Sequence, residues 1–401
     1  MRIAGIVAEY NPFHNGHAHH VEMTRSKNGG CEATHVVAVM SGSFVQRGEP
    51  AVMTKFDRAR AALAGGVDLV IELPTPRVLS SAEGFAFGAV SLLDALGCVD
   101  VLSFGSEAGA VAPLEKAVNH METERFANLM RYYMGSGSAF PEAQQKALAE
   151  IAGSTTAAVL DTPNNTLGIE YIKALRRLGS GIEPFTVKRH GSAHDSLVPL
   201  GDIASASYLR RLMTESQWVN ALPFMPAPCA SVLSEAASAG RAPALVGRTN
   251  DAAILARLRT MTVEELSGIA NVSEGLENRL YNAIRSAASL AELEEAVKTK
   301  RYPLTRVRRL IMSAFLGVPA GYATRRPPYI RVLAANSRGK EILSASKPSV
   351  PFFYRAAQVA KFDAESQVLW ELETRASDLH ALFCSTPQPC GADFTTGLIR
   401  E

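Results

Sequence analysis

The sequence contains no long hydrophobic run. No stretch approaches the roughly 18 consecutive apolar residues that a membrane-spanning helix needs. The first apolar segment, IAGIVAEY at residues 3–10, is too short for the core of a signal peptide, and no small-residue cleavage site follows it. We therefore expect a chain with neither a membrane anchor nor a secretory leader.

Cysteine and net charge are also scarce. The five cysteines form no Cys-x-x-Cys pair and no other zinc-ligand spacing, so no metal site is expected from them. An odd number of cysteines without a disulfide framework favours the reducing cytoplasm. The formal net charge is only +2 on 401 residues, so any nucleic-acid binding must depend on a local basic patch. No feature of the sequence indicates a protein partner.

The first half of the chain alternates strands with helices. Short apolar runs indicate strands at residues 2–10, 34–42, 67–74, 99–107 and 183–189. The intervening patterns indicate helices at 16–27, 52–64, 81–97, 112–134 and 140–152, and another that Asn165 or Thr166 could cap. This order predicts an α/β fold with a doubly wound, Rossmann-like parallel sheet.

Helical patterns dominate after about residue 215, particularly between 231 and 316. Residues 329–335 and 350–356 predict a small pair of strands, and a helix follows them to about Phe383. The change of rhythm predicts two domains. Residues 1–215 would form the α/β domain, and residues 216–401 a mainly helical one.

Two histidines follow the first predicted strand, in the segment YNPFHNGH at residues 10–17. Ligands of doubly wound sheets bind beyond the carboxyl ends of the strands, which is where this turn lies. Gly16 allows close backbone approach, and the next helix offers N–H groups to an anion. His14 and His17 could donate to phosphate oxygens and stabilise a transition state. The alternative is a tight turn with surface histidines. The position of the motif directly after the first strand favours a functional site over this alternative.

The segment NPFHNGH resembles the signature of the HIGH-type nucleotidyltransferases, which use this turn in attack on the α-phosphate of ATP. A second segment, IASASYLRRLM at 203–213, is similar to the Ser-x-Ser-x-x-Arg loop with which those enzymes grip the triphosphate. Ser205, Ser207 and Arg210 would then contact phosphate. By itself this segment could equally be a serine-capped helix with an exposed arginine.

Further segments resemble one family, the bacterial tRNA(Met) cytidine acetate ligases. They are MSGSFVQRGEPAVMTKFDRARAAL, VDLVIELP, LSFGSE, TPNNTLGIEYIKAL, VKRHGSAHD, NVSEGLENRLYNAI and TKRYPLTRVRRLIMSAFLG. The resemblance implies activation of acetate by ATP, with Mg²⁺ bridging the phosphates, to give acetyl-adenylate. It further implies transfer of the acetyl group to N4 of the wobble cytidine of elongator tRNA(Met).

The same resemblance implies a set of site residues. The ATP site would comprise Val7, Ala8, Glu9, Tyr10, Asn11, Pro12, Phe13, His14, Asn15, Gly16, His17, Ala18, His19 and His20, with Gly105, Asn164, Asn165, Arg189, Ser205, Ser207 and Arg210. Asn164 or Asn165 would read adenine, and the choice between them stays open. His14, His17 and Arg47 would be catalytic. Gln46 and Glu49, on the same loop as Arg47, could reach the same cleft.

A basic stretch marks a second candidate site. Eleven lysines and arginines lie between Lys298 and Lys340, and no acidic residue interrupts them. On a helix starting near Leu304, apolar residues share one face and arginines occupy the other, so one face can dock while the other meets phosphate. We therefore predict tRNA binding at 298–340, through Lys300, Arg301, Arg306, Arg308 and Arg309. A merely solvated basic face is the alternative.

Two other functions compete with the acetate ligase. A small-molecule adenylyltransferase would share the histidine turn and the Ser-Ser-Arg loop but would not need the basic helical half. A non-catalytic RNA-binding module would explain the basic stretch but not the two histidines at the end of a strand.

Overall fold

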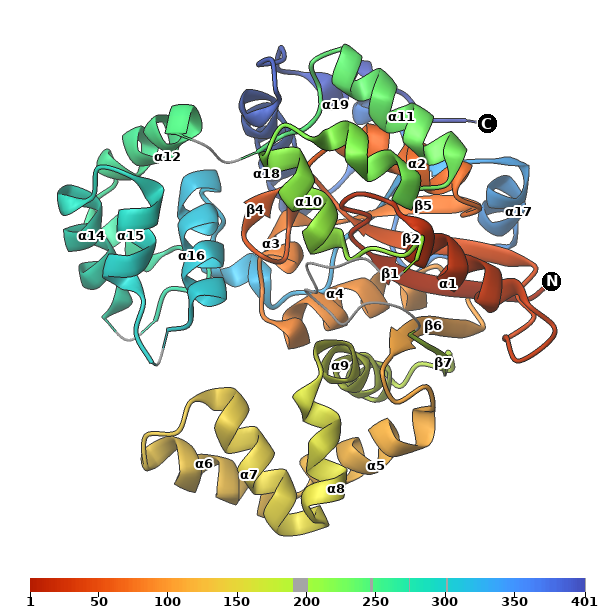
Figure 1. The fold of residues 1–401 in the computed structure, drawn as a ribbon, viewed down its shortest axis with the longest axis horizontal. Coiled ribbons are helices and arrows are strands. Elements are labelled where there is room, and N and C mark those ends of the chain that lie inside the picture. The colour runs from red at the N-terminus through yellow and green to blue at the C-terminus, as the bar shows by residue number, and fades with distance from the viewer. Residues whose placement is uncertain (190–200, 246–247, 274, 301, 401) are drawn as a thin grey trace.

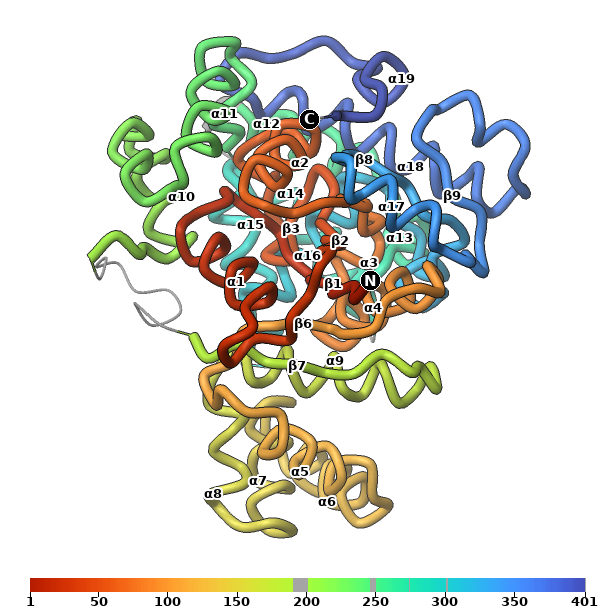
Figure 2. The backbone as a smooth tube through the Cα atoms, turned by 90° about the vertical axis from the view of Figure 1, so that its right-hand side faces the viewer, coloured from red at the N-terminus to blue at the C-terminus, as the bar shows by residue number. Residues whose placement is uncertain are grey.

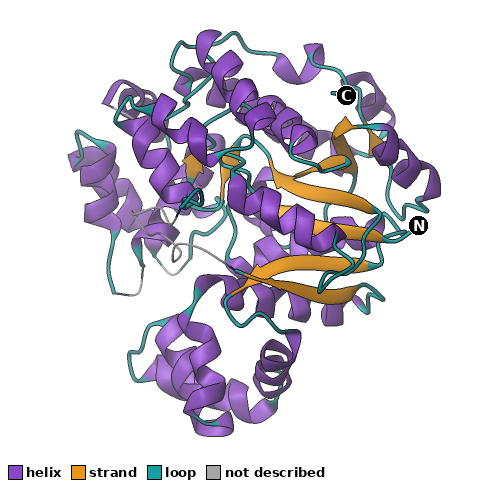
Figure 3. Cartoon of the chain, turned by 45° about the vertical axis from the view of Figure 1, so that its right-hand side comes forward, coloured by secondary structure: helices purple, strands orange, loops and turns teal. Residues whose placement is uncertain are grey.

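The computed structural model describes residues 1–189, 201–245, 248–273, 275–300 and 302–400. Within these ranges, seven strands form one sheet in the order β7-β6-β1-β2-β5-β8-β9. Figure 3 shows the strands in orange among the surrounding helices. The strands are β1 (Ile3–Ala8), β2 (His35–Ser41), β5 (Leu69–Leu73), β6 (Val101–Ser106), β7 (Glu183–Lys188), β8 (Ile330–Ala335) and β9 (Phe352–Phe353). A separate hairpin joins β3 (Phe44–Val45) to β4 (Glu49–Pro50).

The first-half strands pair as expected for a doubly wound sheet. β1 lies between β2 and β6, β5 follows β2, and β7 follows β6, with every one of these pairs parallel. Because β1 is central, the chain reverses its direction of winding beside it. The carboxyl ends of β1 and β6 therefore meet at the switch point where such folds bind ligands. The predicted α/β fold class is confirmed.

Alternate side chains along the strands build two separate cores. On one face, residues such as Ile3 and Val39 pack with α4 (Ala82–Ala95) and α9 (Pro163–Leu178). On the other face, residues such as Ile6 and Met40 pack with α1 (Asn15–Arg25), α2 (Lys55–Ala64) and α11 (Ala227–Ser238). The sheet is thus covered on both faces, which explains why its strands read as continuous apolar runs.

A helical lobe projects from the β6 end of the molecule, as Figures 1 and 2 both show. It contains α5 (Val111–Met121), α6 (Glu124–Gly135), α7 (Phe140–Ala152), α8 (Ser154–Ala157) and the 3-10 turn η1 (Ala158–Asp161). The helical region expected at 112–134 consists of two helices, because the Thr123 hydroxyl accepts from the Phe126 amide and starts a new one. The helix expected to start at Asn165 or Thr166 begins earlier, at Pro163.

A third core lies in the helical second half. It is built mainly from α12 (Arg248–Arg259), α13 (Val263–Ser267), α14 (Leu276–Ser286), α15 (Leu290–Val297), α16 (Leu304–Leu316) and α18 (Ala364–His380). The remaining helices are α3 (Thr75–Val78), α10 (Ala206–Thr214), α17 (Ser337–Ala345) and α19 (Ala392–Thr395), with 3-10 turns η2 (Trp218–Phe224), η3 (Ala320–Ala323), η4 (Ala356–Lys361) and η5 (Ala381–Phe383). No helix in the described ranges is long and apolar enough to cross a membrane.

The strand pair expected at 329–335 and 350–356 does form, but it is not a separate small sheet. β8 pairs antiparallel with β5 and β9 pairs parallel with β8, so the second half of the chain extends the sheet of the first half. The pairing is set by the open edge of β5, which no local pattern in residues 329–356 encodes. The proposed domain boundary near residue 215 falls just after α10, and it stays a proposal.

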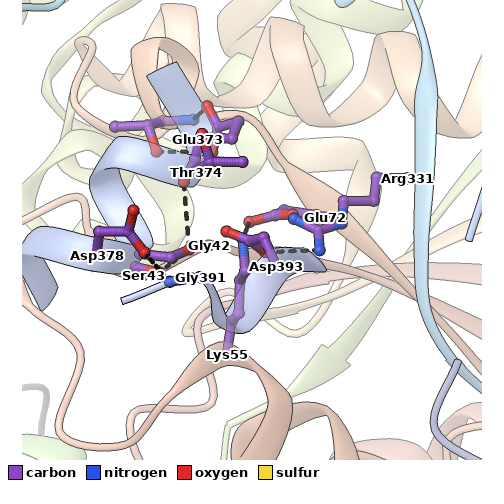
Figure 4. Close-up of polar contacts among 12 residues, drawn as sticks. Gly42, Ser43, Lys55, Glu72, Arg331, Glu373, Thr374, Asp378, Gly391 and Asp393 are labelled. Carbon is purple, nitrogen blue, oxygen red and sulfur yellow. Dashed lines mark hydrogen bonds and ion pairs between the residues drawn. The ribbon is translucent and has the colours of Figure 1, made fainter. Parts of the chain in front are cut away.

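A buried cluster of four charges fastens the end of the chain to this sheet (Figure 4). Lys55 Nζ on α2 lies 2.8 Å from Glu72 Oε1 on β5 and 2.8 Å from Asp393 Oδ1 on α19. Arg331 on β8 completes the cluster, with Nη1 2.9 Å from Glu72 Oε2 and Nη2 2.6 Å from Asp393 Oδ1. These side chains are only 1–6% exposed, and two cations balance two carboxylates. Arg331 is therefore no part of a basic RNA-facing surface.

Candidate active site

A cavity of about 300 Å³ opens at the carboxyl ends of β1, β6 and β7. Its lining includes most of the residues predicted for the ATP site: Val7, Ala8, Glu9, Tyr10, Asn11, His14, Gly16, His17, His19, His20, Gly105, Asn164, Arg189, Ser205, Ser207 and Arg210, together with Arg47. Five predicted residues do not line it, namely Pro12, Phe13, Asn15, Ala18 and Asn165. The fold thus brings together segments that are separated by up to two hundred residues in the sequence.

The two signature histidines form the floor of this cavity at the start of α1. Their rings stack with centroids 3.8 Å apart. His14 Nδ1 accepts a hydrogen bond from the Gly16 amide at 3.0 Å, and His17 Nδ1 accepts from the His14 amide at 3.3 Å. A neutral imidazole carries one N–H, so both rings must hold their proton on Nε2. Each histidine can therefore donate from Nε2 to an oxygen of a bound ligand.

Gly16 is needed for this arrangement. A β-carbon at that position would lie 2.9 Å from His14 Cε1 and 3.1 Å from His14 Nδ1. Any side chain at residue 16 would push the His14 ring away from the amide that fixes its tautomer. The glycine between the two histidines is therefore explained by close packing at the site rather than by turn geometry.

The histidines are held in their neutral form. Burial, followed by the charges of Arg189 and Arg210, lowers the pKa of His14 to about 3. Burial also lowers the pKa of His17 well below its usual value, and that of His20 to about 4. At neutral pH these rings are thus hydrogen-bond donors without a net charge, which can stabilise charge that develops on a ligand.

We expect the free energy of unfolding to fall as the pH is lowered from 7 to 5. Unfolded imidazoles take up protons below about pH 6.5, whereas folded His14 and His20 stay neutral because their pKa values are about 3 and about 4. The unfolded state binds more protons in this window, so each such histidine removes up to about 1.4 kcal/mol of stability per pH unit. Urea unfolding at pH 7, 6 and 5 measures how the free energy of unfolding changes with pH. If His20→Asn shows the same pH dependence as the parent, the buried His20 is not a cause of it.

Arginines and hydroxyls also line the cavity. Arg210 on α10 donates from Nη1 to the Asn11 carbonyl at 3.1 Å and from Nη2 to Ser207 Oγ at 3.0 Å. Ser205 caps α10, since its Oγ accepts from the Tyr208 amide at 3.0 Å. The serine-cap alternative is thus correct for Ser205, and the same cap places Ser207 and Arg210 on the cavity wall. A helix N-terminus, two hydroxyls and a guanidinium suit a polyanion.

The structure separates the two neighbouring asparagines. Asn164 lines the cavity, and its Nδ2 donates to Glu107 Oε1 at 2.5 Å. Asn165 is buried, and its Oδ1 accepts from the Ala108 amide at 3.0 Å, so it holds the loop after β6 in place. Arg189 Nη1 lies 3.5 Å from Asn164 Oδ1. Asn164 is therefore the asparagine in position to meet a ligand, and its reading of adenine stays a prediction.

Aromatic residues that the sequence analysis did not single out complete the cavity wall. Phe85, Phe104 and Tyr171 come from α4, β6 and α9. Each belongs to the apolar pattern of its helix or strand, so the sequence pattern predicts a core residue at each of these positions. A flat apolar surface beside polar groups is typical of small-molecule sites.

The hairpin β3–β4 links this cavity to the helical half. The Gln46 amide donates to Glu9 Oε1 at 2.6 Å, and both Gln46 and Arg47 line the cavity. Gly48 has φ +77°, and a β-carbon there would lie 2.5 Å from the backbone carbon of Arg308. The sequence pattern predicted that Glu49 could reach the same cleft as Arg47, but Glu49 does not line this cavity. It instead accepts from Arg308 Nη1 at 2.8 Å.

The predicted RNA-binding residues fall into different environments. Lys300 is exposed, and Arg306 donates to Ser273 Oγ at 3.1 Å beside the ring of Tyr302. Arg309 is partly buried, and burial lowers its pKa to about 10. Arg308 faces inward, to Glu49 and Glu294. Arg301 lies outside the described residues.

The apolar face of α16 is confirmed, since Val307, Leu310, Ile311, Ala314 and Phe315 are all buried. Its basic face is divided: Arg306 is half-buried beside Ser273, whereas Arg308 joins two parts of the protein. In the described part of the chain, no three His, Cys, Asp or Glu side chains group so as to hold a metal ion.

A parallel strand is followed by His-x-Gly-His, and a Ser-x-Ser-x-x-Arg loop lines the same cavity, which together define a nucleotidyltransferase of the HIGH class. The family model described as HIGH Nucleotidyl Transferase matches residues 1–392. The chain belongs to that family and, within it, to the tRNA(Met) cytidine acetate ligases.

Similar proteins span the whole chain. The tRNA(Met) cytidine acetate ligase of Caldicellulosiruptor saccharolyticus is 40% identical over 388 residues, covering 95% of this chain and 94% of the relative. The one from Acetivibrio thermocellus is 37% identical, covering 100% of both chains. The crystal structure of Thermotoga maritima TmcAL superposes with a TM-score of 0.93 at 32% identity and full coverage of both chains. A second form of that protein, bound with alpha-thio ATP, gives a TM-score of 0.90.

Proposed function

We propose that this chain is an ATP-dependent ligase that makes acetyl-adenylate from acetate. It then transfers the acetyl group to N4 of the wobble cytidine of elongator tRNA(Met), in the cytoplasm. The observation that carries the proposal is the pair of neutral histidines, each with its N–H on Nε2, that line the same cavity as Arg210 and Ser207. Relatives at 36–40% identity are named for the same activity.

In the first step the acetate carboxylate attacks the α-phosphorus of ATP in line, and pyrophosphate leaves with the electrons of the broken P–O bond. Negative charge builds on the α-phosphate oxygens, where His14 and His17 would donate. Arg189, Arg210 and Ser207 would hold the leaving phosphates, and Arg47 either the acetate or the pyrophosphate. Mg²⁺ would arrive bound to the phosphate oxygens of ATP, because Mg²⁺ prefers oxygen ligands.

In the second step the cytosine N4 amine attacks the carbonyl carbon of the mixed anhydride. The new C–N bond replaces the C–O bond to AMP, and the amine loses one proton. The wobble base must leave its stack to react, and an anticodon loop makes this inexpensive because the base there is unpaired.

Labelled acetate tests the proposal against its two alternatives. The protein is incubated with ATP and acetate, and pyrophosphate exchange is followed without RNA. It is then incubated with tRNA and either labelled acetate or labelled acetyl-coenzyme A. Exchange with acetate, and label in cytidine from acetate only, is the expected result. Label from the thioester only would make the protein an acetyltransferase. Adenylation of a phosphorylated metabolite would favour the small-molecule enzyme.

Charge reversal on the exposed edge of the helical half should weaken tRNA binding. In the double variant Lys300→Glu, Arg306→Glu, the salt slope of binding should fall by about one per lost phosphate contact. Acetate-dependent exchange without tRNA should persist, because neither residue lines the ATP cavity. Filter binding over a range of salt concentrations measures the slope. The matched control is Lys116→Glu, Arg125→Glu on the distant α5–α6 lobe, where both side chains are also exposed. An equal loss in both variants would contradict a local site.

A further inference from the structure

A second cavity, of about 420 Å³, lies between the nucleotidyltransferase core and the helical half. The hairpin β3–β4 forms one wall through Gly48 and Glu49, and helices α15 and α16 form the other through Ala291, Glu294 and Arg308. Arg210 lines both this cavity and the ATP cavity. Gln46 and Arg47 also line the ATP cavity, directly before Gly48 in the sequence. The two cavities are therefore neighbours, with Arg210 and one short turn between them.

The second cavity combines a polar edge with an apolar wall. Arg308 donates from Nη1 to Glu49 Oε1 at 2.8 Å and from Nε to Glu294 Oε1 at 3.1 Å. Within the described residues, Arg308 Nη2 and the second oxygens of Glu49 and Glu294 make no hydrogen bond. Val52 and Met312 contribute apolar surface. A donor flanked by two acceptors beside apolar side chains can read the edge of a nucleobase.

This set of groups distinguishes cytosine from uracil. Cytosine presents an N4 amine, which donates, next to N3 and O2, which accept. A carboxylate oxygen can accept from the amine while a guanidinium N–H donates to the ring acceptors. Uracil carries a carbonyl oxygen at the amine position and would place it against a carboxylate. The volume is sufficient for a pyrimidine that has left its stack.

We propose that this cavity receives the cytosine that becomes acetylated, and that Glu294 accepts the proton that its N4 amine loses. This proposal rests on the function proposed above and adds the base pocket and the proton acceptor. The amine nitrogen bonds to the acetyl carbon, the C–O bond to AMP breaks, AMP keeps that electron pair, and the proton moves to Glu294. Arg308 holds the ring and orients the amine toward the side of Arg210, where the adenylate lies.

The environment of Glu294 suits a proton acceptor. Its side chain is 14% exposed, against 33% for Glu49. Burial raises the pKa of Glu294, and the nearby carboxylates of Glu49 and Asp251 raise it further against the lowering effect of Arg308. A carboxylate with a raised pKa takes up a proton more readily than an exposed one.

Two variants test the pocket and the acceptor separately. Ala291 is exposed at the rim of the cavity, so Ala291→Trp can fill the cavity without disturbing the core. Glu294→Gln keeps the size of the side chain but cannot take the proton. Their controls lie on the same helix, at Ala296→Trp and Glu295→Gln, where both residues are exposed and neither lines the cavity.

Two readouts are used. The first is the fluorescence of pyrrolocytosine at the wobble position of an anticodon stem-loop, which reports base entry and needs no reaction. The second is the single-turnover rate of acetyl transfer at saturating tRNA. We expect Ala291→Trp to abolish the fluorescence change and the transfer. We expect Glu294→Gln to keep the fluorescence change, to lower transfer about 10²-fold, and to leave the KM for tRNA within a few-fold of the parent.

The proposal is overturned if Ala291→Trp retains the fluorescence change, if Glu294→Gln transfers at the parent rate, or if the control variants lose as much. Failure of the proposed function has a different signature. In that case the parent protein forms no acetyl-adenylate from acetate and ATP, whereas the fluorescence readout still reports whether a cytosine enters the cavity.

Discussion

Replacing His17 with alanine should lower the rate of acetyl-adenylate formation by about 10²-fold or more, the usual cost of losing one donor to a transition-state oxyanion. His17 lines the ATP cavity, and its Nδ1 is engaged by the His14 amide, so that Nε2–H is left to face the ligand. The imidazole is neutral at working pH because burial lowers its pKa. Its contribution is therefore a fixed hydrogen bond rather than a titrating charge.

Acetate-dependent pyrophosphate exchange measures this loss. Affinity for ATP should change less than the maximal rate, because the hydrogen bond strengthens as charge builds on the α-phosphate. The matched control is His120→Ala on α5, far from the cavity lining. Circular dichroism and the Tm establish that the variant is folded. A folded His17→Ala protein with parental exchange would exclude the role.

Replacing Lys55 with methionine should destabilise the protein by about 3–5 kcal/mol, the scale measured when one partner of a buried ion pair is removed. Lys55 is 1% exposed and lies 2.8 Å from both Glu72 and Asp393. Methionine has a similar length but no charge. The two buried carboxylates, Glu72 and Asp393, would then share Arg331 as their only cation in the cluster. Glu373 adds a further carboxyl group nearby, and burial together with the charge of Glu72 raises the pKa of Glu373 to about 8.

Urea unfolding at pH 7 measures this effect. A control substitution at the exposed Lys146 of the α7 pair with Glu142 should leave the midpoint nearly unchanged. The double variant Lys55→Met, Asp393→Leu should lose less free energy of unfolding than the sum of the losses in the two single variants, since it removes one charge of each sign. If Lys55→Met unfolds at the parental urea concentration, the cluster does not hold α19 to the sheet.

The architecture of the first half could be predicted because its signals are local. Five runs bounded by turn residues mark the strands, of which all but the edge strand β7 are mostly buried, and the helical periods between them favour parallel pairing. The histidine turn was identifiable for the same reason: its position after the first strand places it at the switch point. The break within the helical region at 112–134 could not be read from the apolar period, because Thr123 starts a new helix there.

The role of Arg308 shows the limit of a local pattern. In the sequence it is one of eleven uninterrupted basic residues, and helical geometry places it at the edge of the exposed face. Its partners, Glu49 and Glu294, stand 259 and 14 residues away. The sequence pattern predicts that Arg308 lies on the surface. Arg308 becomes part of a cavity wall because the hairpin β3–β4, distant in sequence, packs against α16, and Gly48 permits that contact.

The sequence by itself determined the parallel strands, the histidine turn and the serine-arginine loop, because each depends on residues within one turn or one period of each other. It also determined the family, through short segments spread along the chain. Tertiary structure alone decided that β8 and β9 extend the sheet, that Lys55 and Arg331 are buried with Glu72 and Asp393, and that a second cavity lies beside the first. These features depend on pairings between elements hundreds of residues apart. The free energy of such pairings comes from burial and charge neutralisation in the assembled core, which no short segment of sequence contains.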